Sequence, residues 1–400
     1  MSDVERTPVR LSGLDGLRGI AVAGVLLFHA GRFGGGFLGV DLFFALSGYL
    51  ITDLLLREVR ASGTVSLVAF WGRRFRRLLP ALTAALAGTT LAVWALGDAE
   101  LRTTALADGP WVQANLVNWH LLAESAGYWD RFGPGRVFGH LSSIAVEEQF
   151  YLVWPVVVLL VAGTAKRVEH RVALVAAVTS VLSLALMVVL FTPDDPTRVY
   201  TGTDTRAFSL LLGAAAATGP VRRAVSGVVG RHVVPAQAVV AGALAVLWLS
   251  VDGEGAHWLF QGGLFVHSLL AALLILLCAL APDSVVTGLF GRAPLRLLGL
   301  VSYSLYLWHW PVFLVLSEDR LGLDGWARTA VVCAVSLVLA VLSKVLVEDP
   351  IRFRARWARG RAGLVALAAT TVVLAVLWAA VPRPPVTLVD VGDLHVSRSG

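Results

Sequence analysis

The amino-acid sequence predicts an all-α, polytopic integral membrane protein with about eleven transmembrane helices around a central polar cavity. Hydrophobic residues make up 57% of the 400-residue chain and charged residues only 15%, and the mean hydropathy is +0.75. Soluble helices show one apolar stripe, whereas segments such as residues 78–97 are apolar on every face and long enough to cross a bilayer. A soluble core of this length would not need so much apolar sequence.

The apolar segments predict one membrane domain over residues 11–381, between a cytosolic segment at 1–10 and a short extracytoplasmic tail at 382–400. No small-residue cleavage site follows the first segment, which therefore predicts a retained helix. The longest outer connection, about 98–138, carries aromatic side chains that favour an interfacial belt. About eleven segments are expected, of which the sixth is short; their centres lie near residues 24, 46, 88, 152, 182, 212, 243, 272, 308, 338 and 372.

The basic residues predict the orientation in the plasma membrane. Loops on the amino-terminal side hold 21 of the 33 Lys and Arg residues, and loops on the other side hold 9. This bias places the amino terminus in the cytosol and the carboxyl terminus outside, with membrane lipid around the bundle. The arginines carry no recognition motif for nucleic acid. Cys278 and Cys333 lie inside apolar segments, so neither a disulfide framework nor a metal site is expected.

The first apolar segment contains two ionisable residues, Arg18 and His29. A separation of eleven residues brings them to within about 20° of the same helix face and about 16 Å apart along the axis. An ionisable residue at this depth must face the bundle interior or a water-filled cavity, which indicates a functional site. The alternative is a structural histidine bonded to a backbone carbonyl.

A second polar stripe follows in residues 138–155. His140, Glu147 and Tyr151 recur at intervals of seven and four and share one helix face, while Glu148 is turned aside by about 100°. Adjacent glutamates are costly in a membrane helix, so Glu147 is predicted to meet a histidine or an arginine of another helix. A structural ion pair for Glu147 and a packing role for Tyr151 are the alternatives.

A third cluster comprises four arginines just before the third segment. Arg73 and Arg76 fit the charge expected at a cytosolic edge, whereas Arg74 and Arg77 lie three residues apart on one face and form a fork suited to a phosphate. Weaker candidates are Asp41 and Ser47 in GVDLFFALSGYLIT, Asp204 and Arg206 in YTGTDTRAFSLLLGA, and His309 in VSYSLYLWHWPVF.

Taken together, these motifs resemble the membrane-bound acyltransferase-3 family, the bacterial O-acyltransferases that acylate cell-surface sugars and some antibiotics. The motifs occur in the family's order over about residues 11–355. One departure is Ser142, which stands where the family often has tryptophan. The resemblance is carried by LDGLRGIAV…FHAG, GGFLGVDLFFALSGYLIT, WGRRFRRLLPA, VEEQFYLVWP, TGTDTRA, SYSLYLWHWPV and VEDPIRFR.

The resemblance implies transfer of an acyl group, with acetyl-CoA as the expected donor, onto a hydroxyl of a glycan or glycoside. It implies no bound cofactor. Arg18 and His29 match the family's functional pair, its R-x-x-R arginines match Arg74 and Arg77, and its glutamate matches Glu147. Family members with an eleventh span commonly continue into an extracytoplasmic hydrolase-like domain. The membrane domain is therefore expected to act alone or with a separate extracytoplasmic transferase.

Our sequence hypothesis makes His29 a general base, oriented by Glu147, because histidine titrates near neutrality. A covalent acyl-histidine is the variant. The remaining candidates would bind donor or substrate: Arg18, Arg74, Arg77, Asp41, Ser47, Tyr151, Arg206 and His309. A proton-coupled transporter of a small solute is the alternative function, although the repeats typical of transporters are not visible. A catalytically idle partner subunit is a weaker third option.

Overall fold

The computed structural model describes residues 12–124, 136–164, 167–252, 256–355 and 360–381, and every regular element in these ranges is a helix. The predicted all-α class is therefore confirmed. The proposed end segments, 1–10 and 382–400, lie outside the described residues. The longer helices are α1 (Ser12–His29), α2 (Gly39–Ser62), α3 (Leu67–Leu96), α6 (Ser142–Thr164), α7 (Val168–Val189), α11 (Val233–Ser250), α12 (Gly263–Leu280), α14 (Ala293–Val315), α16 (Gly325–Ser343) and α17 (Gly360–Ala380).

Shorter helices connect and buttress these elements. The α9 helix (Thr203–Ala216) packs against α2, α7 and α12, and two π-helical turns, Lys344–Glu348 and Pro350–Arg354, follow α16. The others are α4 (Ala99–Gln113), α5 (Val117–Ala123), α8 (Thr197–Thr201), α10 (Gly219–Val229), α13 (Val285–Phe290) and α15 (Glu318–Leu321), with 3₁₀ turns η1 (Gly34–Leu38), η3 (Gly139–Leu141), η4 (Gly230–His232) and η5 (His257–Leu259).

Eight stretches of the described chain are long and apolar enough to cross a membrane, so the expected number of eleven is not confirmed. The segment near residue 212 forms α9, whose 14 residues extend about 21 Å, short of a hydrocarbon core of about 30 Å. The eight are Gly34–Ser62, Leu67–Leu96, Gly139–Gly163, Val168–Val189, Gly219–Ser250, Gly263–Leu280, Ala293–Val315 and Gly325–Arg354.

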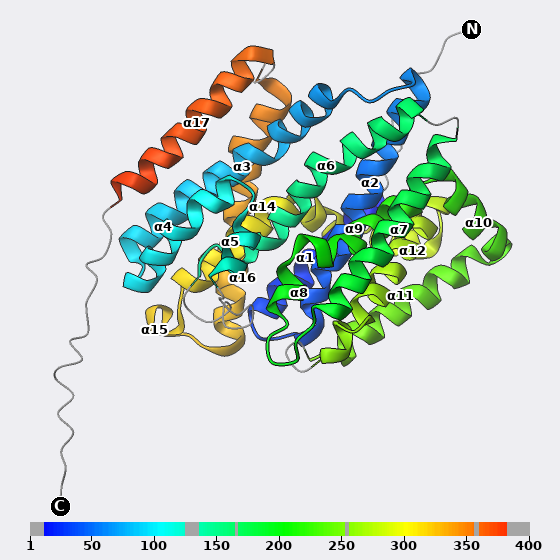
Figure 1. Cartoon of the computed structure of the whole chain (residues 1–400). Coiled ribbons are helices and arrows are strands. Elements are labelled where there is room, and N and C mark those ends of the chain that lie inside the picture. Colours follow the sequence, from blue (N-terminus) through cyan, green and yellow to red (C-terminus); the bar gives the residue numbers. More distant parts are fainter. Residues whose placement is uncertain (1–11, 125–135, 165–166, 253–255, 356–359, 382–400) are drawn as a thin grey trace, which may run out of the picture.

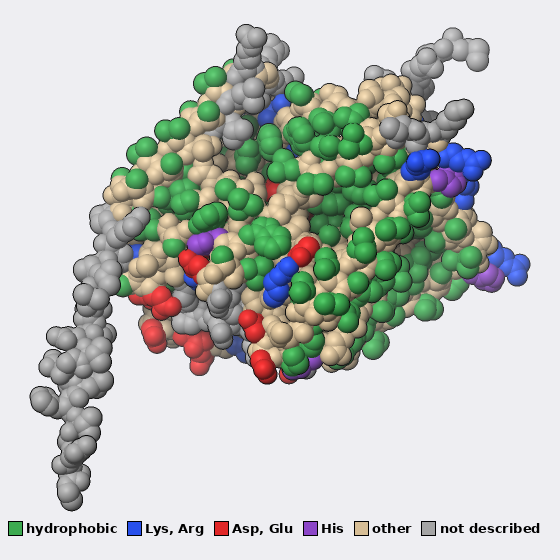
Figure 2. Space-filling model, in the orientation of Figure 1, with side chains coloured by type: hydrophobic (Ala, Val, Ile, Leu, Met, Phe, Trp, Pro, Cys, Tyr) green, Lys and Arg blue, Asp and Glu red, His purple; other side chains and the backbone are tan. Residues whose placement is uncertain are grey.

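Figure 1 shows the arrangement of these helices. The α3, α4 and α17 helices form one flank and α10, α11 and α12 the opposite one, with α1, α2, α6, α9 and α14 between them. Large apolar side chains of α7, α11, α16 and α17 are exposed on the outside of the bundle, as expected for surfaces that meet lipid. Figure 2 shows a broad apolar band on this face, with acidic side chains along its lower edge and basic ones at its upper right.

Glycines allow the central helices to approach closely. A Cβ atom on Gly16 of α1 would lie 1.7 Å from the Phe290 carbonyl oxygen, and one on Gly299 of α14 would lie 1.7 Å from the Asp15 carbonyl oxygen. The α2–α9 contact has the same character, since a Cβ on Gly48 would lie 1.8 Å from the Leu210 carbonyl oxygen. Small residues of this kind drive helix association in lipid through close van der Waals packing. They bring the polar side chains of α1, α2, α9 and α14 together.

The long connection expected at about 98–138 is largely helical where it is described. It contains α4, which Asp98 caps by accepting a hydrogen bond from the Leu101 amide at 2.8 Å, and then α5. The half-exposed Trp111 ring stacks on His120 at 5.0 Å between centroids. Pairing of the backbone within these helices lets the segment cover one end of the bundle beside α6 and α8.

Candidate active site

Two neighbouring cavities lie inside the bundle. The histidine cavity encloses about 430 Å³ of empty space, and its polar lining consists of His29, His140, Ser142, Ser143, Tyr200, Thr201, Arg206 and Tyr306. The arginine cavity encloses about 640 Å³, and its polar lining consists of Arg18, Ser47, Arg74, Arg77, Ser143, Glu147, Glu148, Tyr151, Ser302, Tyr303 and Tyr306.

A shared wall separates the two cavities. Val40, Phe44, Ser143 and Tyr306 line both of them. The Tyr306 hydroxyl donates to the His140 carbonyl oxygen at 2.9 Å and lies 2.6 Å from the Ser143 hydroxyl, so it ties α14 to the start of α6. The two cavities are therefore one layer of side chains apart.

The histidine cavity contains a hydrogen-bonded imidazole pair. His309 Nδ1 lies 2.7 Å from the Tyr306 carbonyl oxygen, and His309 Nε2 lies 2.9 Å from His29 Nδ1. A carbonyl oxygen can only accept, so a neutral His309 carries its proton on Nδ1 and accepts at Nε2. His29 Nδ1 must then donate, which places the lone pair of a neutral His29 on Nε2. This is the tautomer that a general base needs.

Arg206 is fixed beside the same cavity by buried partners. Its guanidinium donates to Asp41 Oδ1 at 2.9 Å and to the Tyr200 carbonyl oxygen at 3.1 Å, and it lies 4.2 Å from the centre of the Tyr200 ring. Asp41 is fully buried, also accepts from Ser209 at 2.8 Å, and is not part of either cavity lining. A buried charge requires such pairing, so Asp41 holds Arg206 in place.

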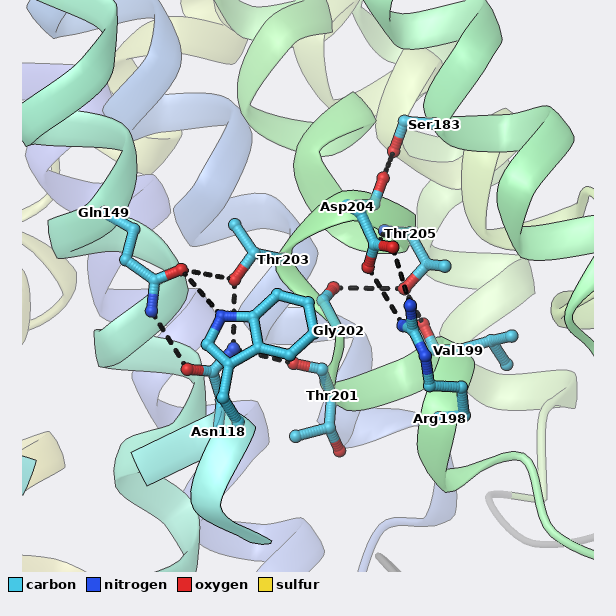
Figure 3. A network of polar contacts seen from close by, with 11 residues as sticks. Asn118, Gln149, Ser183, Arg198, Val199, Thr201, Gly202, Thr203, Asp204 and Thr205 are labelled. Carbon is cyan, nitrogen blue, oxygen red and sulfur yellow. Dashed lines mark hydrogen bonds and ion pairs between the residues drawn. The ribbon is translucent and has the colours of Figure 1, made fainter. Parts of the chain in front are cut away.

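A polar network supports the rim formed by α8 and the start of α9 (Figure 3). Asn118 of α5 donates to the Thr201 carbonyl oxygen at 3.2 Å and to the Thr203 hydroxyl at 2.9 Å, while Gln149 of α6 donates to the Asn118 side-chain oxygen at 3.0 Å. Arg198 and Asp204 form a two-point ion pair at 2.9 and 2.6 Å on the other side of the turn. These bonds hold Tyr200 and Thr201 at the histidine cavity.

The arginine cavity combines three cationic side chains with two acidic ones. Arg18 comes from α1, and Arg74 and Arg77 come from α3. Within the described residues no carboxylate lies within 4 Å of these three guanidinium groups. Glu147 instead accepts hydrogen bonds from Ser47 and Tyr151, and the Arg74 guanidinium lies 4.7 Å from the centre of the Tyr151 ring. Positive charge is therefore available to an anionic ligand.

The structure sorts the sequence candidates into two groups. His29 and Arg206 line the histidine cavity, with His309 behind the former and Asp41 behind the latter. The expectation that Glu147 orients His29 differs from the contacts, because the two residues line separate cavities and His309 contacts His29. Arg18, Ser47, Arg74, Arg77, Glu147 and Tyr151 all line the arginine cavity.

Sequence reasoning missed several lining residues. Tyr306 lies three residues before His309, a spacing that places both on one helix face, and this signal was available in SYSLYLWHWPV. Glu148 lines the arginine cavity beside Glu147 although it is turned aside on the helix. Thr201 gave no signal, because one threonine in a short connection has no distinguishing pattern.

This arrangement defines a polytopic membrane protein whose interior holds one cavity lined by three arginines and a second cavity that contains a histidine pair. The acyltransferase domain of the acyltransferase-3 family matches residues 11–345. The chain therefore belongs to this family, as the motifs predicted.

The chain is also similar to curated bacterial proteins. It is 38% identical to the putative peptidoglycan O-acetyltransferase YrhL of Bacillus subtilis over 86% of this chain and 55% of that protein. It is 36% identical to peptidoglycan O-acetyltransferase OatA of Listeria monocytogenes, over 85% of this chain and 55% of that protein. It is 34% identical to O-acetyltransferase OatA of Staphylococcus aureus, over 86% of this chain and 58% of that protein. The chain thus spans just over half the length of these relatives. No solved structure matches it significantly.

Proposed function

We propose that this protein transfers an acetyl group from acetyl-CoA, bound at the arginine cavity, to a hydroxyl of a cell-surface glycan or glycoside at the histidine cavity. One observation carries the proposal: three arginines line one cavity with no carboxylate within 4 Å of them among the described residues, and a histidine pair whose contacts leave a lone pair on His29 Nε2 lies at the next cavity. The names of the relatives favour a peptidoglycan sugar as the acceptor.

Donor binding would use Arg18, Arg74 and Arg77. The planar guanidinium group binds phosphate oxygens through paired, charge-assisted hydrogen bonds, and coenzyme A carries several phosphates. Glu147 and Tyr151 lie at the same cavity, where they would orient the arginines rather than touch phosphate. The pantetheine arm would extend from this cavity towards the shared wall.

Acyl transfer would use His29 as the general base. His29 Nε2 accepts the proton of the acceptor hydroxyl as its oxygen attacks the thioester carbon. The tetrahedral intermediate collapses with cleavage of the carbon–sulfur bond, and the proton passes from His29 to the departing thiolate. His309 is a positioning residue, because its bond to His29 Nδ1 fixes the tautomer. General-base catalysis typically contributes about 10²–10⁴ in rate.

In this proposal the reacting groups meet at the shared wall. Phe44 and Val40 provide apolar side chains there, which suit an acetyl group, while Tyr306 and Ser143 provide the polar closure. We propose that the thioester reaches His29 past these four residues. The acetyl group would then enter from one side of the membrane and leave on the other.

The proposed orientation places the amino terminus and the arginine cavity towards the cytosol and the histidine cavity towards the outside. The excess of basic residues on the amino-terminal side supports it. The separation of basic and acidic side chains in Figure 2 agrees with it. A proton-coupled transporter is not favoured, because the chain belongs to an acyltransferase family. A separate extracytoplasmic transferase remains a proposed partner.

The test uses membranes that contain the wild type or His29→Ala, incubated with radiolabelled acetyl-CoA and with isolated glycans, lipids and small glycosides. We expect label in one hydroxyl-bearing fraction and a decrease of about 10²–10⁴ for the variant. Thermal unfolding of both proteins in detergent checks that the variant is folded. Near-normal transfer by a folded His29→Ala protein would exclude the base assignment. Absence of label with folded wild type and every acceptor would exclude the function.

A further inference from the structure

Two polar side chains of the histidine cavity lack ordinary hydrogen bonds. Thr201 is only 2% exposed, and its buried side-chain hydroxyl has no hydrogen-bond partner within the described residues. His140 is 3% exposed, and neither ring nitrogen is within hydrogen-bonding geometry of a described neighbour, with the Tyr306 and Leu307 carbonyl groups beside the ring. Both residues line the cavity that contains His29.

An unpaired buried polar group is unfavourable, so its retention calls for an explanation. Neither residue is loosely held. Asn118 fixes the backbone of Thr201, and the Tyr306 hydroxyl fixes the backbone of His140. The side chains therefore remain at the cavity surface, where a ligand can reach them. A ligand that enters this cavity therefore meets a lining that includes both groups.

We propose that Thr201 and His140 form the subsite for a carbohydrate hydroxyl of the acceptor, which deepens and rests on the proposed function. A threonine hydroxyl donates and accepts, and a neutral imidazole offers one donor and one acceptor. A sugar hydroxyl also does both, whereas a thioester carbonyl oxygen only accepts. The pair is thus suited to the acceptor rather than to the acyl group. His29 remains the base, and the new subsite selects and positions the sugar.

The chain contains a matched control for this proposal. Thr89 of α3 is 1% exposed and its hydroxyl also lacks a hydrogen-bond partner within the described residues, yet it is not part of either cavity lining. Replacing threonine by valine at either position exchanges a hydroxyl for a methyl group of similar size. Any effect that comes only from removing an unpaired buried hydroxyl should be the same in both variants.

The experiment compares Thr201→Val and Thr89→Val in detergent, with soluble muropeptides as acceptor and saturating acetyl-CoA. For Thr201→Val we expect the KM for muropeptide to rise about tenfold, because the variant loses one hydrogen bond of ordinary strength to the acceptor. The KM for acetyl-CoA should not change. We expect Thr89→Val to change neither KM. Without ligand, both variants should unfold at or above the wild-type temperature, since each removes an unsatisfied hydroxyl. His140→Phe, which keeps an aromatic ring, should also raise the KM for muropeptide.

Binding is measured separately as the rise in unfolding temperature caused by muropeptides, which does not depend on turnover. We expect this rise in the wild type and in Thr89→Val, and a smaller one in Thr201→Val. Suppose that the wild type is active and that Thr201→Val has the wild-type KM for muropeptide and the wild-type rise in unfolding temperature. This result would overturn the subsite but not the proposed function. Failure of the wild type both to bind and to acetylate muropeptides would overturn the subsite for this acceptor. Failure of the wild type to transfer acetyl to any acceptor would overturn the proposed function itself.

Discussion

The arginine cavity and the histidine cavity share residues of α1, α2, α6 and α14, but their polar linings differ: arginines and glutamates line the first, and histidines line the second. The α1 helix contributes Arg18 to the first and His29 to the second, and α6 contributes Glu147 to the first and Ser142 to the second. One cavity holds cations that suit an anionic ligand, and the other holds imidazoles in a defined tautomer. Polar residues eleven positions apart on one helix can therefore line two separate cavities.

The physical costs of the two cavities also differ. Three arginines close together repel one another, and the carboxylates of Glu147 and Glu148 at the same cavity offset part of this repulsion. The histidine pair can remain neutral and needs only hydrogen bonds. The arginine cavity should therefore depend on its ligand more than the histidine cavity does.

After His29→Ala, the largest effect is expected from removing one charge of the arginine cavity. For Arg74→Gln we expect the KM for acetyl-CoA to rise about 10- to 100-fold, because the variant loses a hydrogen bond between two charged groups. The KM for the acceptor should not change. The measurement is initial rate against acetyl-CoA concentration.

Arg73→Gln is the matched control. Arg73 is 47% exposed and pairs with Glu58 at 3.3 Å, outside the arginine cavity. Its kinetics should resemble those of the wild type. Equal effects at Arg73 and Arg74 would mean that general charge at this end of α3, and not the arginine cavity, attracts acetyl-CoA.

An intermediate effect is expected at the shared wall. Tyr306→Phe removes the hydroxyl that contacts Ser143 and the His140 carbonyl oxygen. The lost hydrogen bond is worth about 1 kcal/mol, which corresponds to a factor of about five. We therefore expect the ratio of acetyl-CoA hydrolysis to acetyl transfer to rise about fivefold, because water reaches the thioester more easily. Tyr303→Phe is the control, since Tyr303 donates to the Leu78 carbonyl oxygen at 3.1 Å and lines only the arginine cavity. The same ratio in both variants would contradict a sealing role for Tyr306.

The smallest effect is expected outside both cavities. Asp108, His120 and Glu124 offer ligand atoms within 4.8 Å of one another, but the Arg136 guanidinium already pairs with Asp108 at 2.8 Å and with Glu124. The hydrogen bond from Arg136 lowers the pKa of Glu124 below its ordinary value of 4.5. This interaction stabilises the fold above that value and is lost as the pH falls through the lowered pKa.

Glu124→Gln should therefore reduce the loss of unfolding temperature on acidification. We expect the fall between about pH 6 and pH 3.5 to be slightly smaller in the variant than in the wild type, because the pair is solvent-screened. Differential scanning fluorimetry in detergent measures it, with the exposed Glu100→Gln of α4 as control. A larger acid-induced fall in Glu124→Gln than in the wild type would refute the direction of this pKa shift.

Much of the fold followed from composition, because the cost of exposing polar backbone to lipid leaves long apolar segments few structures besides helices. The number of spans did not follow, since α1, α9 and α17 are helices but are not among the eight described stretches that are long and apolar enough to cross a membrane. Part of the site also followed. Arg18, Arg74 and Arg77 were predicted from their positions and spacing, because a cationic side chain beside an apolar helical segment is costly in lipid. This cost does not depend on which helices the segment packs against.

The sequence by itself determined what lies along each helix. A period of 3.6 residues placed Arg18 and His29 on one face of α1, and Glu147 and Tyr151 on one face of α6. Only the tertiary structure decided which helices meet. His29 pairs with His309, which lies 280 residues away in the chain, while Glu147 lies at the other cavity. Periodicity acts within a helix, whereas contacts between helices depend on close packing at residues such as Gly16 and on the fit of whole helix surfaces.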